Sequence, residues 1–281
     1  MPRTYNTGDV IFDLHTHTTA SDGALQPAGL IQLAAEHNVD CLAITDHDTL
    51  SAFETLDPTS SSGPKLLVGI EMSTVWRGHS VHIIGLNVDR HNRTLLDGLV
   101  AQQAARLGRA TTIASRLTNI GIDDPLPAVL SIAGSSTIGR PHFARHLVNI
   151  GTVKDTRTAF RKYLGAGKPG DVKQCWASLP EVISWIAAAG GTPVLAHPTK
   201  YGMTWTKLRA LIEEFRMVGG LCVEVVCGSQ EMLVTKKLAD LTNEFELTAS
   251  CGSDFHQLSS WSAPGRFQPL PSSVTRVWDT W

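Results

Sequence analysis

The chain lacks the features that mark secreted, membrane-spanning and nucleic-acid-coating proteins. Its five cysteines are odd in number and scattered without a CxxC pair, which argues against a disulfide framework and a zinc ribbon. Lysine and arginine number 24 against 26 acidic residues, so the net charge of −2 argues against broad binding to duplex nucleic acid or an anionic membrane. No apolar run approaches the ~20 residues needed to cross a bilayer, and residues 1–8 are polar. We therefore expect a cytoplasmic protein without a membrane partner.

Strand-like and helical segments alternate along much of the chain. With 281 residues, it can bury a sizeable core in one or two domains. Alternation of apolar strand patterns with amphipathic helical patterns indicates an α/β protein with a parallel sheet. A helix is also expected from Asp48 to about residue 56, and the Pro-, Ser- and Gly-rich residues 57–64 should form a loop. The expected strands span residues 10–14, 39–45, 66–71, 80–88, 192–196, 221–226 and 247–250.

The alternation stops in the middle of the chain. Between residues 92 and 173, strand-like runs almost vanish and amphipathic helical segments replace them. We interpret residues 92–173 as a helical insertion that covers the active site. The remaining residues, 1–91 and 174–281, are then expected to form one barrel-like domain. The expected helices of the insertion span residues 94–120, 126–131, 141–149 and 155–163.

Metal-binding side chains gather where the predicted strands end. His15 and His17 are two residues apart in a strand-like run, so both imidazoles can point to one side and bind one ion. A lone histidine is more often a structural residue than a ligand. In parallel α/β folds, however, the carboxyl ends of the strands meet, and functional groups collect there. The candidates at these ends are His15, His17, His47, Glu71, His197, Asp254 and His256.

The same segments resemble the PHP (polymerase and histidinol phosphatase) family of metal-dependent phosphoesterases. The resemblance covers nearly the whole chain, with the motifs in order, and it implies a distorted (β/α)7 barrel that holds three divalent metal ions. The matching segments are Asp13-Leu14-His15-Thr16-His17, Ile44-Thr45-Asp46-His47-Asp48, Gly69-Ile70-Glu71, Val81-His82-Ile83-Ile84-Gly85, Ala196-His197-Pro198 and Gly252-Ser253-Asp254-Phe255-His256.

The resemblance also implies a ligand set, with Glu71 shared between two ions and Glu71, His197 and Asp254 as catalytic residues. Asp22 departs from the pattern, because some relatives have histidine there; a carboxylate favours harder ions such as Mn²⁺ or Fe²⁺, and Zn²⁺ also stays open. The alternative for Asp22 is a turn residue before Gly23. The three implied groups of ligands are His15, His17, Glu71 and Asp254; Glu71, His82 and His197; and Asp22, His47 and His256.

Three further residues are expected to bind substrate. Arg140 stands before a helix predicted to begin at Pro141, so its guanidinium and the helix N-terminus can both face an anion. The run from Gly139 to His142 is similar to that of a PHP subgroup with a helical insertion, which comprises nucleoside phosphatases and short-RNA 5′-exonucleases. Lys168, on a Gly-rich loop, is a second phosphate candidate. A structural salt bridge for Arg140 and a solvated Lys168 are the alternatives.

A mixed imidazole and carboxylate ligand set suits phosphate ester hydrolysis, because clustered divalent ions can hold a hydroxide and polarise the phosphoryl group. We therefore predict a phosphatase for a small nucleotide, either a nucleoside 3′,5′-bisphosphate or an AMP-like monophosphate. A 5′→3′ exonuclease on very short RNA is the main alternative, and a histidinol-phosphate phosphatase is a weaker one. A non-catalytic metal-binding scaffold is the alternative from another class, and retention of every motif ligand argues against it.

Overall fold

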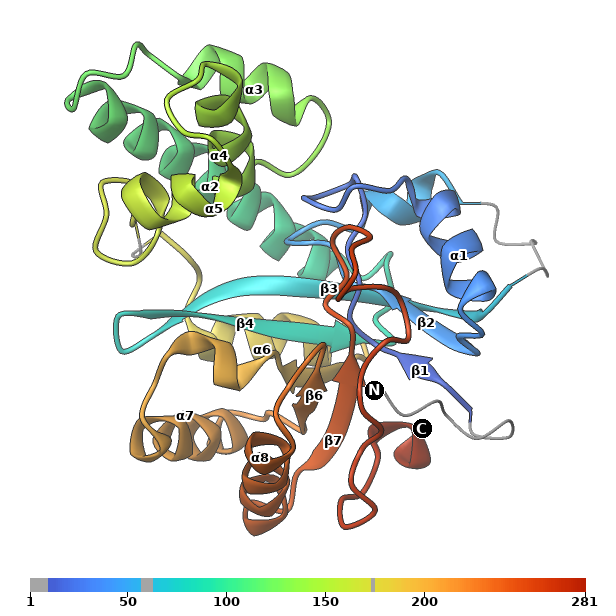
Figure 1. The fold of residues 1–281 in the computed structure, drawn as a ribbon. Coiled ribbons are helices and arrows are strands. Elements are labelled where there is room, and N and C mark those ends of the chain that lie inside the picture. The colour runs from blue at the N-terminus through green and yellow to red at the C-terminus, as the bar shows by residue number, and fades with distance from the viewer. Residues whose placement is uncertain (1–9, 57–62, 173–174) are drawn as a thin grey trace.

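Seven strands form the framework of the protein (Figure 1). The computed structural model describes residues 10–56, 63–172 and 175–281. The strands follow one another in the sheet in chain order, from β1 to β7. The sheet closes on itself, because the backbone N–H of Leu14 donates to the carbonyl of Cys251 at 3.1 Å and Thr16 forms a parallel bridge with Phe255. The strands are β1 (Phe12–Asp13), β2 (Cys41–Ile44), β3 (Lys65–Trp76), β4 (His79–Leu86), β5 (Thr192–Leu195), β6 (Cys222–Cys227) and β7 (Thr248–Gly252).

One strand runs against the others. β4 is antiparallel to both β3 and β5, whereas the other neighbouring pairs are parallel. β3 and β4 are joined by a tight turn at Arg77 and Gly78, which both have positive φ, as a two-residue hairpin turn requires. The barrel prediction is confirmed, but the prediction of a parallel sheet was wrong at β4. β3 also continues to Trp76, so Glu71 lies within its strand and not at the end.

Helices cover the outside of the barrel. α7 shows why they pack there, because Leu208, Leu211, Ile212 and Phe215 form one buried stripe with helical spacing. The helix predicted from Asp48 was wrong, since that segment contains only the 3₁₀ turn η1 (Ser51–Glu54), and most of the predicted loop 57–64 lies outside the described residues. The other elements of this part are α1 (Pro27–Glu36), α6 (Leu179–Ala188), η3 (Pro198–Tyr201), α7 (Trp205–Met217), α8 (Met232–Glu244) and η4 (Val277–Thr280).

The central part of the chain is helical and has an apolar core of its own. In Figure 1 its helices lie on the opposite side of the β3–β4 hairpin from α7 and α8. The first helix, α2, connects the two cores: Leu95 and Leu99 pack in the barrel cluster, whereas Ile113 and Leu117 pack with the helical segments. The elements are α2 (Arg93–Thr118), α3 (Leu126–Ala133), α4 (Arg140–Asn149), α5 (Thr156–Ala159) and the π-helical turn η2 (Phe160–Leu164).

This arrangement fits the predicted insertion, although the division of the chain into domains stays a prediction. Its proposed boundary at residues 173 and 174 lies outside the described residues. Within the described ranges, no helix combines the length and the apolar composition that crossing a membrane requires.

Candidate metal centre

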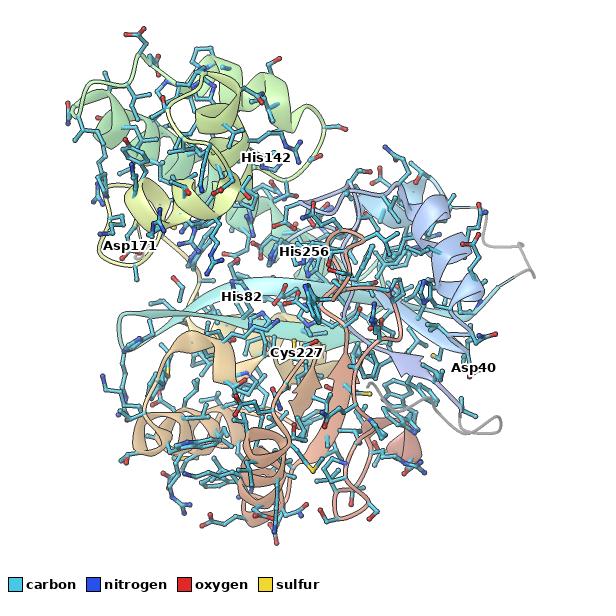
Figure 2. All side chains as sticks on the ribbon, in the orientation of Figure 1. Asp40, His82, His142, Asp171, Cys227 and His256 are labelled. Atoms are coloured by element: carbon cyan, nitrogen blue, oxygen red, sulfur yellow. The ribbon has the colours of Figure 1, made fainter. Side chains whose placement is uncertain are left out.

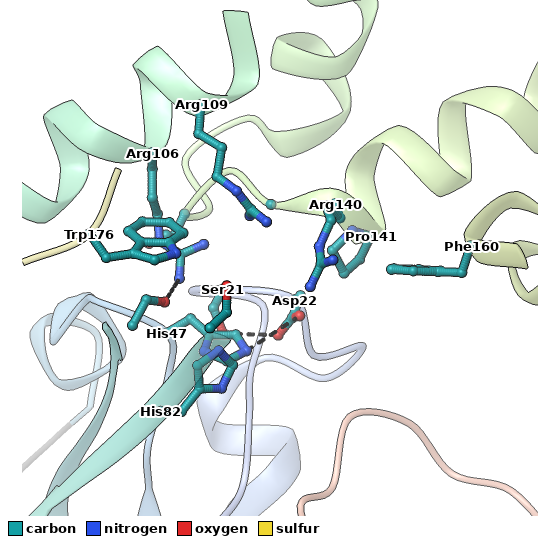
Figure 3. Close-up of a pocket in the computed structure, with 14 residues that line it drawn as sticks. Ser21, Asp22, His47, His82, Arg106, Arg109, Arg140, Pro141, Phe160 and Trp176 are labelled. Carbon is teal, nitrogen blue, oxygen red and sulfur yellow. Dashed lines mark hydrogen bonds and ion pairs between the residues drawn. The ribbon is translucent and has the colours of Figure 1, made fainter. Parts of the chain in front are cut away.

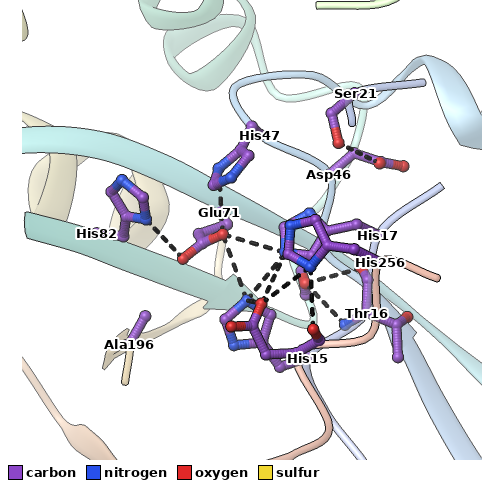
Figure 4. Close-up of polar contacts among 12 residues, drawn as sticks. His15, Thr16, His17, Ser21, Asp46, His47, Glu71, His82, Ala196 and His256 are labelled. Carbon is purple, nitrogen blue, oxygen red and sulfur yellow. Dashed lines mark hydrogen bonds and ion pairs between the residues drawn. The ribbon is translucent and has the colours of Figure 1, made fainter. Parts of the chain in front are cut away.

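Glu71 lies at the middle of a cluster of histidines inside the barrel (Figure 4). Its side chain is fully buried, on β3. Its Oε1 lies 2.9 Å from Nδ1 of His82 and 2.8 Å from Nε2 of His197. Its Oε2 lies 3.1 Å from Nδ1 of His47. One carboxylate therefore contacts imidazoles that the chain supplies from three different segments.

The His-x-His pair faces the same carboxylate. Nε2 of His15 and Nε2 of His17 each lie 3.3 Å from Oε2 of Glu71, and the two nitrogens lie 3.1 Å from each other. Both nitrogens also lie 3.4 Å from Oδ1 of Asp254, which follows β7. The expectation that residues two apart point to one side is confirmed by these distances.

Asp22 is the centre of a second group on the same side of the barrel. Its carboxylate oxygens lie 3.4 Å from Nε2 of His256, 3.8 Å from Nε2 of His47 and 3.8 Å from Nδ1 of His17. The rings of His17 and His256 are stacked, with centroids 4.2 Å apart. His17 thus contacts both groups of side chains, a position that the sequence motif did not reveal.

A turn holds Asp22 in place. Asp46 accepts hydrogen bonds from the hydroxyls of Thr18 and Ser21, each at 2.6 Å, and this ties the turn to the end of β2. A Cβ atom at Gly23 would lie 2.4 Å from the carbonyl oxygen of His17, so only glycine fits there. Asp22 is therefore a turn residue whose carboxylate also reaches the histidines.

The donor atoms of the cluster fit divalent cations. Of the described residues, four have a buried side-chain nitrogen or oxygen without a hydrogen-bond partner, and all four belong to this cluster: His17, His47, Glu71 and His197. Buried polar atoms are normally paired, so such a concentration of unpaired atoms needs an explanation. Imidazole nitrogens and carboxylate oxygens are ligands of Zn²⁺, Mn²⁺ and Fe²⁺. Bound ions would satisfy Nδ1 of His47 and Oε2 of Glu71, which lie 3.1 Å apart.

The pKa shifts of the buried side chains also favour a bound cation in the cluster. Burial alone would raise the pKa of Glu71, but the neighbouring imidazoles of His47 and His15 hold that pKa well below its ordinary value. Burial also opposes protonation of His15, yet the carboxylates of Glu224 and Glu71 keep its pKa well above the ordinary value. The carboxylate of Glu71 thus stays ionised and favours positive charge at the centre of the cluster.

Two residues at the cluster were missed by the sequence reasoning. Glu224, which is 1 % exposed, lies in β6 and contacts His15 and His197. Lys200 donates from Nζ to Oδ2 of Asp254 at 2.6 Å, leaving Oδ1 toward the histidines. A signal for Glu224 was available, because it is the only charged residue in the otherwise apolar strand Cys222–Cys227.

A cavity of about 120 Å³ joins this cluster to the central helices (Figure 3). Barrel residues that line it include Asp22, His47 and His82. Arg106, Arg109 and Arg140 line it from α2 and α4, and Figure 3 shows their side chains extending toward the barrel. The sequence reasoning singled out only Arg140 of these arginines.

The three guanidinium groups line one cavity and repel one another electrostatically. Arg106 forms a buried ion pair with Asp48, with Nε 2.7 Å from Oδ2, and Arg140 donates from Nη1 to the carbonyl of Leu164 at 3.2 Å. Burial, with the nearby charge of Arg140, lowers the pKa of Arg109 to about 10. Burial likewise lowers the pKa of Arg140. An anion in this cavity would relieve the repulsion between the cations.

The other two predicted substrate residues, His142 and Lys168, are not among the described residues that line this cavity. His142 is buried in the helical part of the molecule (Figure 2), and its Nδ1 accepts a hydrogen bond from the backbone N–H of Gly139 at 3.1 Å. The predicted roles of His142 and Lys168 stay predictions. α4 begins at Arg140, one residue before the predicted start at Pro141.

Comparisons with known proteins agree with the motifs. A family model of the PHP domain matches residues 13–118. The chain is 41% identical over 275 residues to the 5′-3′ exoribonuclease Rnm of Salmonella typhimurium, covering 97% of this chain and 94% of the relative. It is 40% identical over 269 residues to a 3′,5′-nucleoside bisphosphate phosphatase of Chromobacterium violaceum, covering 95% of this chain and 94% of the relative.

A solved structure from Chromobacterium violaceum also resembles this fold. It is described as an amidohydrolase with bound sulfate and no metal, and it matches with a TM-score of 0.88 and 39% identity, covering 96% of this chain and 95% of that one. The family predicted from the motifs is confirmed by these matches: the chain belongs to the PHP-domain family.

Proposed function

We propose that this protein is a metal-dependent phosphatase of small nucleotides that carry two phosphates, such as a nucleoside 3′,5′-bisphosphate. One observation carries the proposal: a single cavity is lined on one side by Asp22, His47 and His82 of the cluster and on the other by three arginines. Divalent metal ions bound by the histidines and carboxylates could bind one phosphate, and the arginine guanidinium groups could bind another. The cavity therefore suits a ligand with a phosphate at each end. The phosphatase relative from Chromobacterium violaceum supports this substrate class.

We propose three divalent ions, Mn²⁺, Fe²⁺ or Zn²⁺, held by the ligand groups predicted from the motifs. The contacts around Glu71 and Asp22 support these groups. His17 lies with Asp22, His47 and His256 and adds a fourth candidate ligand for the ion at Asp22. When bound, such ions would activate water, polarise the phosphoryl group and neutralise charge on the leaving oxygen. Glu71 is placed to bridge two ions, because its two oxygens face different histidines.

The protein's own side chains would orient the substrate. Arg140 and Arg109 would bind the second phosphate and so fix the distance between the nucleoside and the metal centre. Arg106 already forms an ion pair with Asp48, so its proposed role is to hold α2 against the barrel. His142 and Lys168 remain proposed substrate residues on the segments around this cavity. We propose that residues 92–173 act as a cover that limits the size of the substrate.

We also propose a cytoplasmic location. Within the described ranges, Cys41, Cys175, Cys222, Cys227 and Cys251 are all free, and four of them are buried. Free thiols of this kind are typical of a reducing compartment.

A 5′→3′ exonuclease acting on very short RNA is the second candidate, and the match to the exoribonuclease Rnm favours it. Both reactions are hydrolysis at phosphorus, and they differ in what the phosphorus carries. In the phosphatase the phosphate has no further ester, whereas in the exonuclease it is joined to a second nucleotide. The same metal centre and the same arginines could therefore serve both.

A length series separates the two candidates. The Mn²⁺-loaded protein would be assayed on a nucleoside 3′,5′-bisphosphate, a mononucleotide and oligoribonucleotides of increasing length, with free phosphate and mononucleotides measured in each sample. The phosphatase proposal expects the highest kcat/KM on the bisphosphate or mononucleotide, with free phosphate as product. A rate that rises with length and releases mononucleotides would instead establish the exonuclease.

A further inference from the structure

Glu224 contacts two histidines that the proposed metal centre requires. It lies in the middle of β6 and is 1 % exposed. Its Oε1 is 2.9 Å from Nδ1 of His15, and its Oε2 accepts a hydrogen bond from the backbone N–H of His197 at 2.6 Å. One carboxylate thus links residues that are far apart in the chain and that face opposite oxygens of Glu71.

The chemistry at each oxygen of Glu224 is different. The backbone N–H of His197 can only donate, so Oε2 must accept. His15 uses Nε2 toward Glu71, His17 and Asp254, and for Nε2 to bind a metal its lone pair must be free. The ring proton must then be on Nδ1, where Oε1 of Glu224 accepts it.

The second contact fixes an unusual backbone. His197 has φ of 26°, which lies in the left-handed region that side chains other than glycine rarely adopt. It directly precedes the turn η3, which begins at Pro198. The hydrogen bond to Glu224 holds the backbone N–H of His197 in this conformation, and so directs its imidazole at Glu71.

From these contacts we infer that Glu224 is a positioning residue of the metal centre: it sets the tautomer of His15 and the backbone of His197, and so prepares ligands of two different ions. The inference rests on the proposed metal centre. It assigns a role to a residue that belongs to none of the three proposed ligand groups. A carboxylate behind a metal-binding histidine typically raises metal affinity.

Replacement by glutamine gives a sharp test, because glutamine has the same shape but one acceptor oxygen in place of two. In Glu224→Gln, either His15 or His197 meets an NH₂ group instead of an acceptor. Metal-free protein would be titrated with Mn²⁺ and with Zn²⁺ against a chelating indicator, which gives affinity and stoichiometry without an activity assay. We expect affinity to fall by about 10- to 100-fold. Glu224→Asp, which keeps two acceptors on a shorter side chain, should lose less.

Val223→Ala is the matched control, because Val223 is fully buried beside Glu224 on the same strand but contacts none of the proposed ligands through a hydrogen bond. It should destabilise the fold and leave metal affinity unchanged. Equal affinity in Glu224→Gln and the wild type would overturn the inference, as would an equal loss in Val223→Ala. Should Glu224→Gln not fold, Glu224→Asp decides: wild-type affinity in that variant would also overturn it. A wild-type protein that binds no divalent ion would instead refute the proposed metal centre itself.

Discussion

The two sides of the cavity are built in contrasting ways. The barrel side gathers its histidines and carboxylates from segments spread over the chain, from His15 to His256, and each is held by contacts with the others. The opposite side takes its three arginines from two neighbouring helices, α2 and α4. One side attracts cations and the other attracts anions. The difference indicates that metal binding and substrate recognition are carried by separate parts of the molecule and can be altered separately.

The largest effect is expected on the barrel side. Glu71→Gln removes a carboxylate whose two oxygens both face histidines, and no neighbouring single-ion ligand can replace a bridge between two ions. We expect kcat/KM for phosphate release to fall by several orders of magnitude and bound metal to decrease, with the fold intact by circular dichroism. Full activity in a folded, metal-stripped Glu71→Gln protein would refute the metal mechanism.

The contact between the two sides should matter for stability. Arg106→Ala leaves Asp48 buried without its cation, and breaking a buried ion pair in this way costs about 3–5 kcal/mol. The free energy of unfolding, measured in urea, should fall by that amount. Arg216→Ala is the control, because Arg216 pairs with Glu246 on the surface, where removal of one partner has a much smaller effect. Equal losses in both variants would show that the Arg106–Asp48 pair does not join the helices to the barrel.

A smaller and more selective effect is expected from Arg140. Arg140→Ala should reduce transition-state stabilisation by ~2–4 kcal/mol, judged from kcat/KM, as for other losses of a strong charge-stabilising contact. Metal content should not change, because Arg140 contacts none of the proposed ligands in the described structure. Arg145→Ala, on the exposed face of the same helix, should be neutral. If metal is lost in Arg140→Ala and activity falls only in proportion, Arg140 is a structural residue.

The sequence predicted the barrel side of the site better than the helical side. Histidines and carboxylates at the ends of apolar strands form short local motifs, so His15, His17 and Asp254 could be recognised one motif at a time, and the structure brings them together. The strand pattern does not encode direction, however. The reversal of β4 depends on a two-residue turn at Arg77 and Gly78, a signal that the alternation of elements conceals.

The arginine side depends on tertiary contacts. Arg106 and Arg109 lie on an amphipathic helix, where arginine is an ordinary surface residue, and only tertiary packing buries them, with Arg106 against Asp48 and Arg109 against Val172. Glu224 was missed for a related reason. A single acid in a buried strand shows that some partner must exist, but the partners, His15 and His197, are defined only once the barrel has closed.

The most direct test of the account compares three substrates in two proteins. The wild type and Arg140→Ala would each be assayed on a nucleoside 3′,5′-bisphosphate and on the 3′- and 5′-monophosphates of the same nucleoside, with kcat/KM measured for phosphate release. If the metal centre and the arginines bind the two phosphates of one molecule, the wild type should prefer the bisphosphate over either monophosphate, and this preference should be much smaller in Arg140→Ala, where Arg109 alone remains for the second phosphate. A preference of equal size in both proteins would contradict the account.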